Sequence, residues 1–225
     1  SSFDWPEGTR ITALRIIQVL PKTTPPPNEP RIGIAEQTNA RAVLGTVPVE
    51  ADGSAYFLAP PEKILYFQAI DAEGFAVQSM RSGTYLQPGE QLVCAGCHEP
   101  KHRASLLPPQ TPIALRRAPS PITPEPDGAN PFNYVRLVQP VLDRHCTQCH
   151  VEKDALDLRG DIEGKHGWTR SYNNLAKDFG FYFHVSNGSI NTGIHGGVRT
   201  IPAAFGARAA KLTGYLDPSH YEVNL

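Results

Sequence analysis

Residues 134–150, YVRLVQPVLDRHCTQCH, decide the fold of the C-terminal part of the chain. The apolar side chains of this stretch recur at the spacing of one helix face, which predicts a helix that runs directly into Cys146. Pro131 suits the first turn of that helix, and Pro140 inside it predicts a kink. The helix leads into a Cys-x-x-Cys-His motif at residues 146–150.

The same motif occurs a second time, at residues 94–98, and the two motifs contain all 4 cysteines of the chain. In such a motif the two thiols add across the vinyl groups of a haem, and the adjacent histidine places an imidazole under the iron. We therefore predict two covalently bound haem c groups. The residues predicted to hold them are Cys94, Cys97, His98, Cys146, Cys149 and His150.

A zinc site built from the four cysteines is the alternative, because two Cys-x-x-Cys pairs are also typical of zinc ribbons. In a zinc ribbon the two pairs usually lie close in sequence, whereas Cys97 and Cys146 are 49 positions apart across a proline-rich stretch. The spacing therefore favours haem.

His98 and His150 are the predicted proximal ligands of the two irons. The second axial ligand decides the function of each haem. The single methionine, Met80, can serve one haem at most, so histidine is the better source. His220 follows a turn near the C-terminus and is the predicted distal ligand of the second haem. Weaker candidates are His184, His195 and His166.

Two further histidines adjoin the motifs. His145 precedes Cys146 and is expected to face solvent. His102 lies four residues after His98, but Pro100 makes a regular helix between them doubtful. His102 therefore has three open interpretations: it replaces His98 as iron ligand, it binds an additional metal ion near the first haem, or it is exposed.

The first ninety or so residues have the pattern of β structure. Residues 10–19 and 42–51 predict strands, and Asp52-Gly53 predicts a tight turn with a return strand at residues 54–58. A second hairpin is predicted from residues 64–70 and 75–80 around a turn at 71–74. Short strands with frequent turns are typical of a small antiparallel sandwich.

Eight prolines occur in residues 108–131, which predicts a stiff extended linker or a strap across a domain boundary. A further helix is predicted at about residues 203–216. The predicted fold class is α+β. An antiparallel β-sandwich-like domain with one haem c occupies residues 1–107, the linker 108–131, and a small, mainly helical cytochrome c-like domain with the second haem c 132–225.

The composition excludes some function classes. With 21 Lys and Arg against 22 Asp and Glu, the formal net charge is -1, which gives no reason to expect nucleic acid or an anionic membrane as partner. No apolar run approaches the length of a membrane span. The first residues do not look like a natural start, so we expect a mature product or a fragment of a longer protein.

Several stretches resemble the alpha subunit of hydrazine synthase and its bacterial relatives. They include residues 47–57, 65–68, 76–82 and 84–90 before the first motif, and 170–175, 205–212 and 220–225 in the second half. The resemblance covers roughly residues 40 to 225. It implies a β-rich middle domain with one haem and a C-terminal domain with a bis-histidine haem, in which His150 and His220 pair on the second iron.

In the resembled enzyme, a tyrosine four residues beyond the histidine of the first motif takes the proximal place. The matching position here is His102. This departure makes an active role for His102 more plausible, and it puts hydrazine chemistry itself in question. The resemblance further implies that the chain is the cytochrome portion of a larger protein.

Two functions follow from these expectations. If both haems have two protein ligands, the chain is an electron-transfer cytochrome that serves a redox partner protein or other subunits. If the first haem has an open or atypical ligand set, the alternative is a redox enzyme that acts on a small nitrogen or oxygen compound, hydrazine-synthase-like or peroxidase-like. Because thioether-bound haem is assembled outside the bacterial cytoplasm, a periplasmic or otherwise exported location is expected.

Overall fold

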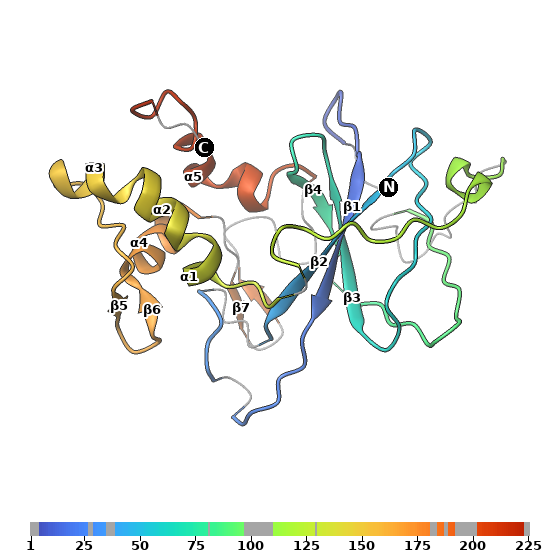
Figure 1. The fold of residues 1–225 in the computed structure, drawn as a ribbon, viewed down its shortest axis with the longest axis horizontal. Coiled ribbons are helices and arrows are strands. Elements are labelled where there is room, and N and C mark those ends of the chain that lie inside the picture. Colours follow the sequence, from blue (N-terminus) through green and yellow to red (C-terminus); the bar gives the residue numbers. More distant parts are fainter. Residues whose placement is uncertain are drawn as a thin grey trace. The chain divides into compact units, whose positions relative to one another are not determined.

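The computed structural model describes residues 5–26, 29–34, 39–80, 82–96, 110–128, 130–180, 184–186, 189–191 and 202–222, with the backbone alone for 184–191. The chain divides into two compact units (Figure 1). The first contains Ser1–Pro21, Ala40–Pro131 and Thr200–Ala204, and the second contains Lys22–Asn39, Phe132–Arg199 and Phe205–Leu225. Each unit is described by itself below.

The first unit is built on a four-stranded antiparallel sheet with strand order β2-β1-β3-β4. The strands are β1 (Ala13–Val19), β2 (Arg41–Pro48), β3 (Ile64–Ile70) and β4 (Ala76–Ser79). The predicted strand near residues 10–19 and the predicted hairpin of β3 and β4 are confirmed. In that hairpin the Phe75 carbonyl accepts from the Asp71 N–H, and the Asp71 carbonyl accepts from the Gly74 N–H. The α+β class is confirmed at this level.

The core of the sheet consists of Ile16, Val47 and Leu65. Irregular segments pack against it, with Phe57 set edge-on to Phe67 at a centroid distance of 5.6 Å and Ile122 beside them. Within the described residues the first unit holds this single larger sheet, and extended segments take the place that a sandwich would give to a second sheet.

The predicted return strand at residues 54–58 is wrong. The turn itself forms, because the Ser54 carbonyl accepts from the Glu50 N–H. The free edge of β2, however, is already paired, since Thr46 and Thr123 exchange two backbone hydrogen bonds of 2.9 Å. The segment after the turn instead bridges to the proline-rich stretch, where Phe57 pairs with Ser120.

Residues 110–128 thus lie along the sheet. A short 3-10 helix, η1 (Ile113–Arg116), begins there, and the Asp52 carboxylate accepts from the Ile113 N–H at 2.8 Å, which lowers the pKa of Asp52. Two ion pairs tie the same stretch to the sheet unit, Arg15 with Glu125 at 2.7 Å and Arg117 with Glu50 at 2.8 Å.

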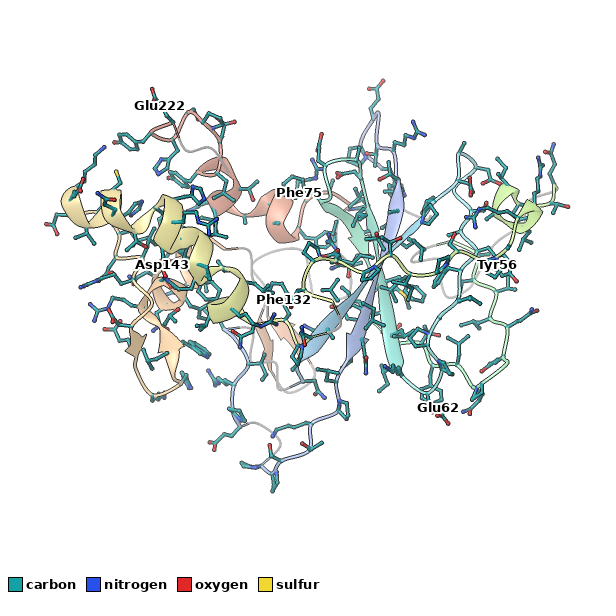
Figure 2. The ribbon with its side chains drawn as sticks, in the orientation of Figure 1. Tyr56, Glu62, Phe75, Phe132, Asp143 and Glu222 are labelled. Carbon is teal, nitrogen blue, oxygen red and sulfur yellow. The ribbon has the colours of Figure 1, made fainter. Side chains whose placement is uncertain are left out.

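The second unit contains short helices and two-stranded hairpins around a core of Leu142, Leu158 and Leu175. Figure 2 shows its side chains, with Asp143 labelled on α2 and Glu222 near the end of the described C-terminal segment. The elements are α1 (Tyr134–Leu137), α2 (Gln139–His145), α3 (Thr147–Glu152), β5 (Ile162–Glu163), β6 (Trp168–Thr169), α4 (Arg170–Asp178), β7 (His184–Ser186), β8 (Ser189–Asn191), η2 (Gly206–Ala209) and α5 (Lys211–Gly214).

The predicted break at Pro140 is confirmed. The helical stretch before the second motif is divided into α1, α2 and α3, and Pro140 lies in the first turn of α2, where a missing N–H costs no helical hydrogen bond. The predicted start at Pro131 is wrong. The helix begins after Asn133, whose side chain accepts from the Arg136 N–H and so caps it.

The predicted continuous helix at residues 203–216 is also wrong. Ala203 and Gly206 have φ values of 61° and 63°, in the left-handed region, and Ala210 is extended. Only η2 and α5 form between and after these breaks. Conversely, α4 was not predicted, although Thr169 caps it by accepting from the Tyr172 N–H and Leu175 is buried in the core. No helix in the described part of the chain is both long and apolar enough to cross a membrane.

Candidate functional site

Cys146 and Cys149 lie at the junction of α2 and α3. Cys146 is the last residue before α3 and packs against the leucine core, and Cys149 lies one helical turn further on. Both are half-buried free thiols. Burial raises the pKa of the Cys146 thiol, and the proximity of Cys149 raises it further. The two sulfurs therefore leave the same helical turn, as a haem attached through both would require.

His150 has a fixed ring. Its Nδ1 lies 2.7 Å from the carbonyl oxygen of Leu156, and because a carbonyl only accepts, Nδ1 carries the hydrogen and donates it. The other ring nitrogen, Nε2, is left with a lone pair for a metal ion. A hydrogen bond of this kind fixes the tautomer and the orientation of the imidazole.

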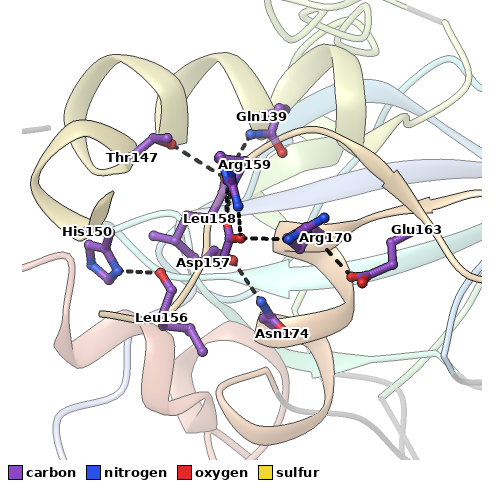
Figure 3. A network of polar contacts seen from close by, with 10 residues as sticks. All are labelled: Gln139, Thr147, His150, Leu156, Asp157, Leu158, Arg159, Glu163, Arg170 and Asn174. Carbon is purple, nitrogen blue, oxygen red and sulfur yellow. Dashed lines mark hydrogen bonds and ion pairs between the residues drawn. The ribbon is translucent and has the colours of Figure 1, made fainter. Parts of the chain in front are cut away.

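The carbonyl that holds His150 belongs to a loop that is itself held from three sides (Figure 3). Asn174 of α4 donates from Nδ2 to the Asp157 carbonyl at 2.8 Å. Gln139 of α2 donates from Nε2 to the Leu158 carbonyl at 3.0 Å, and the Thr147 hydroxyl approaches the same carbonyl at 3.4 Å. Two carbonyls directly after Leu156 are thus fixed by side chains from three helices.

Gln139 is in turn oriented by a buried polar network. The Ser171 hydroxyl donates to Gln139 Oε1 at 2.5 Å, and the Thr169 hydroxyl lies 2.9 Å from that of Ser171. All three side chains are buried. With its oxygen occupied by Ser171, the amide of Gln139 presents its NH2 group to the loop, so the network specifies one arrangement of the loop.

The Asp157 side chain stabilises the loop through ion pairs. Its carboxylate contacts Arg159 at 2.6 Å and Arg170 at 3.1 Å. The hydrogen bond from the Arg159 side chain is the main cause that holds the pKa of Asp157 well below its ordinary value. Arg170 also approaches Glu163 at 3.8 Å, which links the loop to the β5–β6 hairpin.

The structure places His220 close to His150, the two histidines predicted to pair at the second motif. His220 lies on a turn after α5, and the centroids of the two imidazole rings are 6.3 Å apart with planes at 55°. An imidazole nitrogen binds a metal ion at about 2.0–2.1 Å and lies about 1.1 Å from its ring centre, so two rings that bind one ion from opposite sides would have centroids about 6.2–6.4 Å apart. The observed separation fits that arrangement.

Within the described residues, no group of three or more His, Cys, Asp or Glu side chains is gathered as a metal site. Two imidazoles and two thiols are the ligand types of a Cys2His2 zinc site, but in the described part of the chain these four side chains are not gathered as such a site requires. They do match what a haem c needs, namely two axial nitrogens and two sulfurs for its vinyl groups.

The other predicted residues lie elsewhere. His145 is exposed, as expected. His166 stacks on Trp168 at 4.7 Å. Cys94 is an exposed free thiol in the first unit, and Met80 follows β4 there. The following predicted residues lie outside the described residues or side chains: Cys97, His98, His102, His184 and His195.

Sequence reasoning missed the groups that position His150. The Leu156 carbonyl is a backbone atom and leaves no trace in the sequence. Asn174 lies one helical turn before Asp178 on a helix that was not predicted. A signal was present, since Thr169 precedes apolar residues at helical spacing, Tyr172, Leu175 and Phe179.

Three comparisons with known proteins agree. Residues 9–99 match the hydrazine synthase alpha subunit middle domain family. Hydrazine synthase subunit alpha of Kuenenia stuttgartiensis is 24% identical over 192 residues, covering 61% of this chain and 24% of that protein. The solved structure of Kuenenia stuttgartiensis hydrazine synthase superposes with a TM-score of 0.60 at 20% identity, covering 90% of this chain and 34% of that chain.

These matches show a relation to the hydrazine synthase alpha subunit and a similar fold. The chain spans about a quarter of the length of the curated relative and about a third of the solved chain. The relative is named as one subunit.

Proposed function

We propose that this relative of the hydrazine synthase alpha subunit is a dihaem c-type cytochrome that transfers electrons, as the cytochrome portion of a larger protein. One haem c is attached through Cys94 and Cys97 with His98 beside the iron, and the second through Cys146 and Cys149. His150 and His220 take the two axial positions of the second iron.

The observation that carries the proposal is the pair of imidazoles 6.3 Å apart, one of them fixed through Nδ1 by the Leu156 carbonyl. A haem c bound here supplies one-electron oxidation and reduction. With a haem bound, His150 and His220 would both hold its iron and would leave no open position there for a substrate. Because the loop and the buried network hold His150 in place, little reorganisation accompanies a change of charge at the site.

The first haem site rests on its motif and on the family match, which extends over residues 9–99 and so includes the motif. Cys94 is exposed, and the two residues before it, Leu92 and Val93, are 48% and 82% exposed. Apolar side chains of this kind beside a free thiol would be covered by a haem attached there. His102 is proposed as a residue of this site, either on the iron or on an additional metal ion.

The experiment is expression in a bacterial host that attaches haem c in the periplasm, which is also the proposed location. The denatured chain is expected to carry the mass of two haem groups, and the mass of the bare polypeptide would contradict the proposal. Cys146→Ala with Cys149→Ala should remove one of the two.

The axial ligands of the second haem are tested by His220→Ala. The variant is expected to lose the low-spin spectrum of one haem and to bind carbon monoxide when reduced. His145→Ala is the matched control, because His145 is an exposed histidine of the same unit. A spectrum of His220→Ala identical to that of the control would remove His220 from the site.

Redox catalysis at the first haem is the second candidate. It is favoured by the family match, which covers the first motif and bears the name of a synthase. Carbon monoxide binding by the reduced wild-type protein would show an open iron and support a reaction with a small nitrogen or oxygen compound. His102→Ala should then alter the spectrum of that haem, and no gas binding at all would leave electron transfer alone.

A further inference from the structure

A charged side chain and an aromatic ring connect the two segments that carry His150 and His220. Lys153, the residue that directly follows α3, places its Nζ 3.6 Å from the centroid of the Tyr221 ring. Tyr221 directly follows His220, and α3 carries His150. The contact therefore joins the helix that carries His150 to the turn that carries His220.

The turn that carries His220 is mainly stabilised by its own atoms. Asp217 accepts from the Ser219 N–H through its side chain and from the His220 N–H through its carbonyl, both at 2.9 Å. The Pro218 carbonyl accepts from the Glu222 N–H. Within the described part of the chain, none of these hydrogen bonds reaches α3, so they shape the turn without placing it over His150.

The end of this turn has an unfavourable backbone. Tyr221 and Glu222 have φ values of 52° and 60°, in the left-handed region that non-glycine residues rarely adopt. The Tyr221 side chain is also 70% exposed. A large aromatic ring in such a position is retained only where a contact compensates, and the ammonium group of Lys153 over its face is that contact.

His220 itself contacts two aromatic rings. The ring centroid of Tyr215, which directly follows α5, is 5.1 Å from that of His220, and the centroid of Tyr221 is 5.2 Å away, both edge-on. Because Lys153 holds Tyr221, the Tyr221 ring restricts the rotation of the His220 imidazole.

We propose that Lys153 and Tyr221 are positioning residues that latch the His220 turn closed over His150, so that they set how readily His220 leaves the metal. This inference rests on the proposed function, in which both imidazoles ligate one haem iron. A cation–π contact at an exposed site changes an equilibrium about two- to five-fold, so the latch adjusts the lifetime of the bond from His220 to iron rather than creating it.

The test uses the complete protein with its haems, oxidised, and measures the rate at which imidazole in solution displaces His220. That rate is limited by the departure of His220. Tyr221→Leu and Lys153→Met are each expected to raise it about two- to five-fold, because each removes one partner of the contact. Lys165→Met is the matched control, since Lys165 is an exposed lysine on the β5–β6 turn, and its rate should equal that of the wild type.

The conservative variants separate a latch from a general loosening. Tyr221→Phe keeps an aromatic face and Lys153→Arg keeps a cation, so both should retain the wild-type rate. The double variant Tyr221→Leu with Lys153→Met should be no faster than either single variant. Additive effects, or equal acceleration by Tyr221→Phe and Tyr221→Leu, would overturn the latch.

Failure of the latch is distinguishable from failure of the proposed function. A wild-type spectrum without bis-histidine ligation overturns the proposed function, and the latch with it. A bis-histidine spectrum with unchanged rates in Lys153→Met overturns the latch alone. Because Lys153 lies outside the strained turn, Lys153→Met tests the latch even if Tyr221→Leu does not fold.

Discussion

The side-chain amide of Asn174 donates to the main-chain carbonyl of Asp157 across 2.8 Å, and this bond ties α4 to the loop whose Leu156 carbonyl orients His150. The bond is half-buried and joins segments that are 17 positions apart. Through this bond the position of α4 influences the orientation of His150, a candidate metal ligand, although Asn174 itself does not contact His150.

Asn174→Ala is predicted to destabilise the second unit by about 1 kcal/mol, because it leaves the Asp157 carbonyl without its side-chain partner. Unfolding in urea, followed by circular dichroism, measures the change. Asn173→Ala is the matched control, since Asn173 is exposed and its bond to the Glu163 carbonyl is 3.3 Å long. Equal losses in the two variants would show that the loop does not depend on Asn174.

Asp157→Asn is predicted to lower the free energy of unfolding in a pH-dependent manner. The hydrogen bond from Arg159 holds the pKa of Asp157 below its ordinary value, so this carboxylate stabilises the folded state fully above the unfolded pKa of about 3.9. The stabilisation is lost as pH falls below that value toward the folded pKa. The difference between wild type and variant should therefore be largest near pH 7 and shrink below about pH 4.

Urea unfolding at pH 7 and pH 3 measures this difference directly. Asp178→Asn removes an equal charge from an exposed position at the end of α4 and serves as the control. A difference between wild type and Asp157→Asn that stays constant from pH 7 to pH 3 would contradict the role given to the ion pair.

Local signals in the sequence predicted a good part of the fold. Strand β1, the hairpin of β3 and β4, and the break at Pro140 depend on β-branched residues, a turn that ends in glycine and a ring without an N–H, which act within a few residues. The pairing of β2 was not predictable in this way. Its edge is taken by Thr123, a residue of the proline-rich stretch, and only the folded chain brings the two together.

The candidate site was likewise only partly predictable from local sequence. His150 and His220 were nominated because histidine is a ligand type that a sequence displays. The Leu156 carbonyl, Asn174 and the contact between Lys153 and Tyr221 were not, since each depends on where the backbone turns after α3 and α5.

Gly45→Ala is predicted to destabilise the first unit by about 2 kcal/mol or more, because Gly45 has φ 136° and an added Cβ would lie 2.0 Å from the Thr123 carbonyl oxygen. The Thr123 backbone is hydrogen-bonded to Thr46, so it does not readily shift to relieve the clash. Gly53→Ala is the control, with φ 80° but open space around the new methyl group, and should cost about 1 kcal/mol from backbone strain alone. Urea unfolding compares the two, and equal losses would show that the edge pairing is not tight.

Tyr172→Phe is predicted to loosen residues 29–34, which lie between β1 and β2 in the sequence and belong to the second unit, from α4 of the same unit. The Tyr172 hydroxyl accepts from the Ile34 N–H at 2.9 Å, and Trp168 Nε1 donates to the Arg31 carbonyl at 3.4 Å, so this segment packs on α4 and β6. Loss of the hydroxyl leaves the Ile34 N–H unpaired at a cost of about 1 kcal/mol, which corresponds to about five-fold faster amide hydrogen exchange at that position. Tyr85→Phe, at an exposed tyrosine of the first unit, should leave this exchange rate unchanged. Equal protection of Ile34 in Tyr172→Phe and in wild type would mean that the segment is held by other contacts.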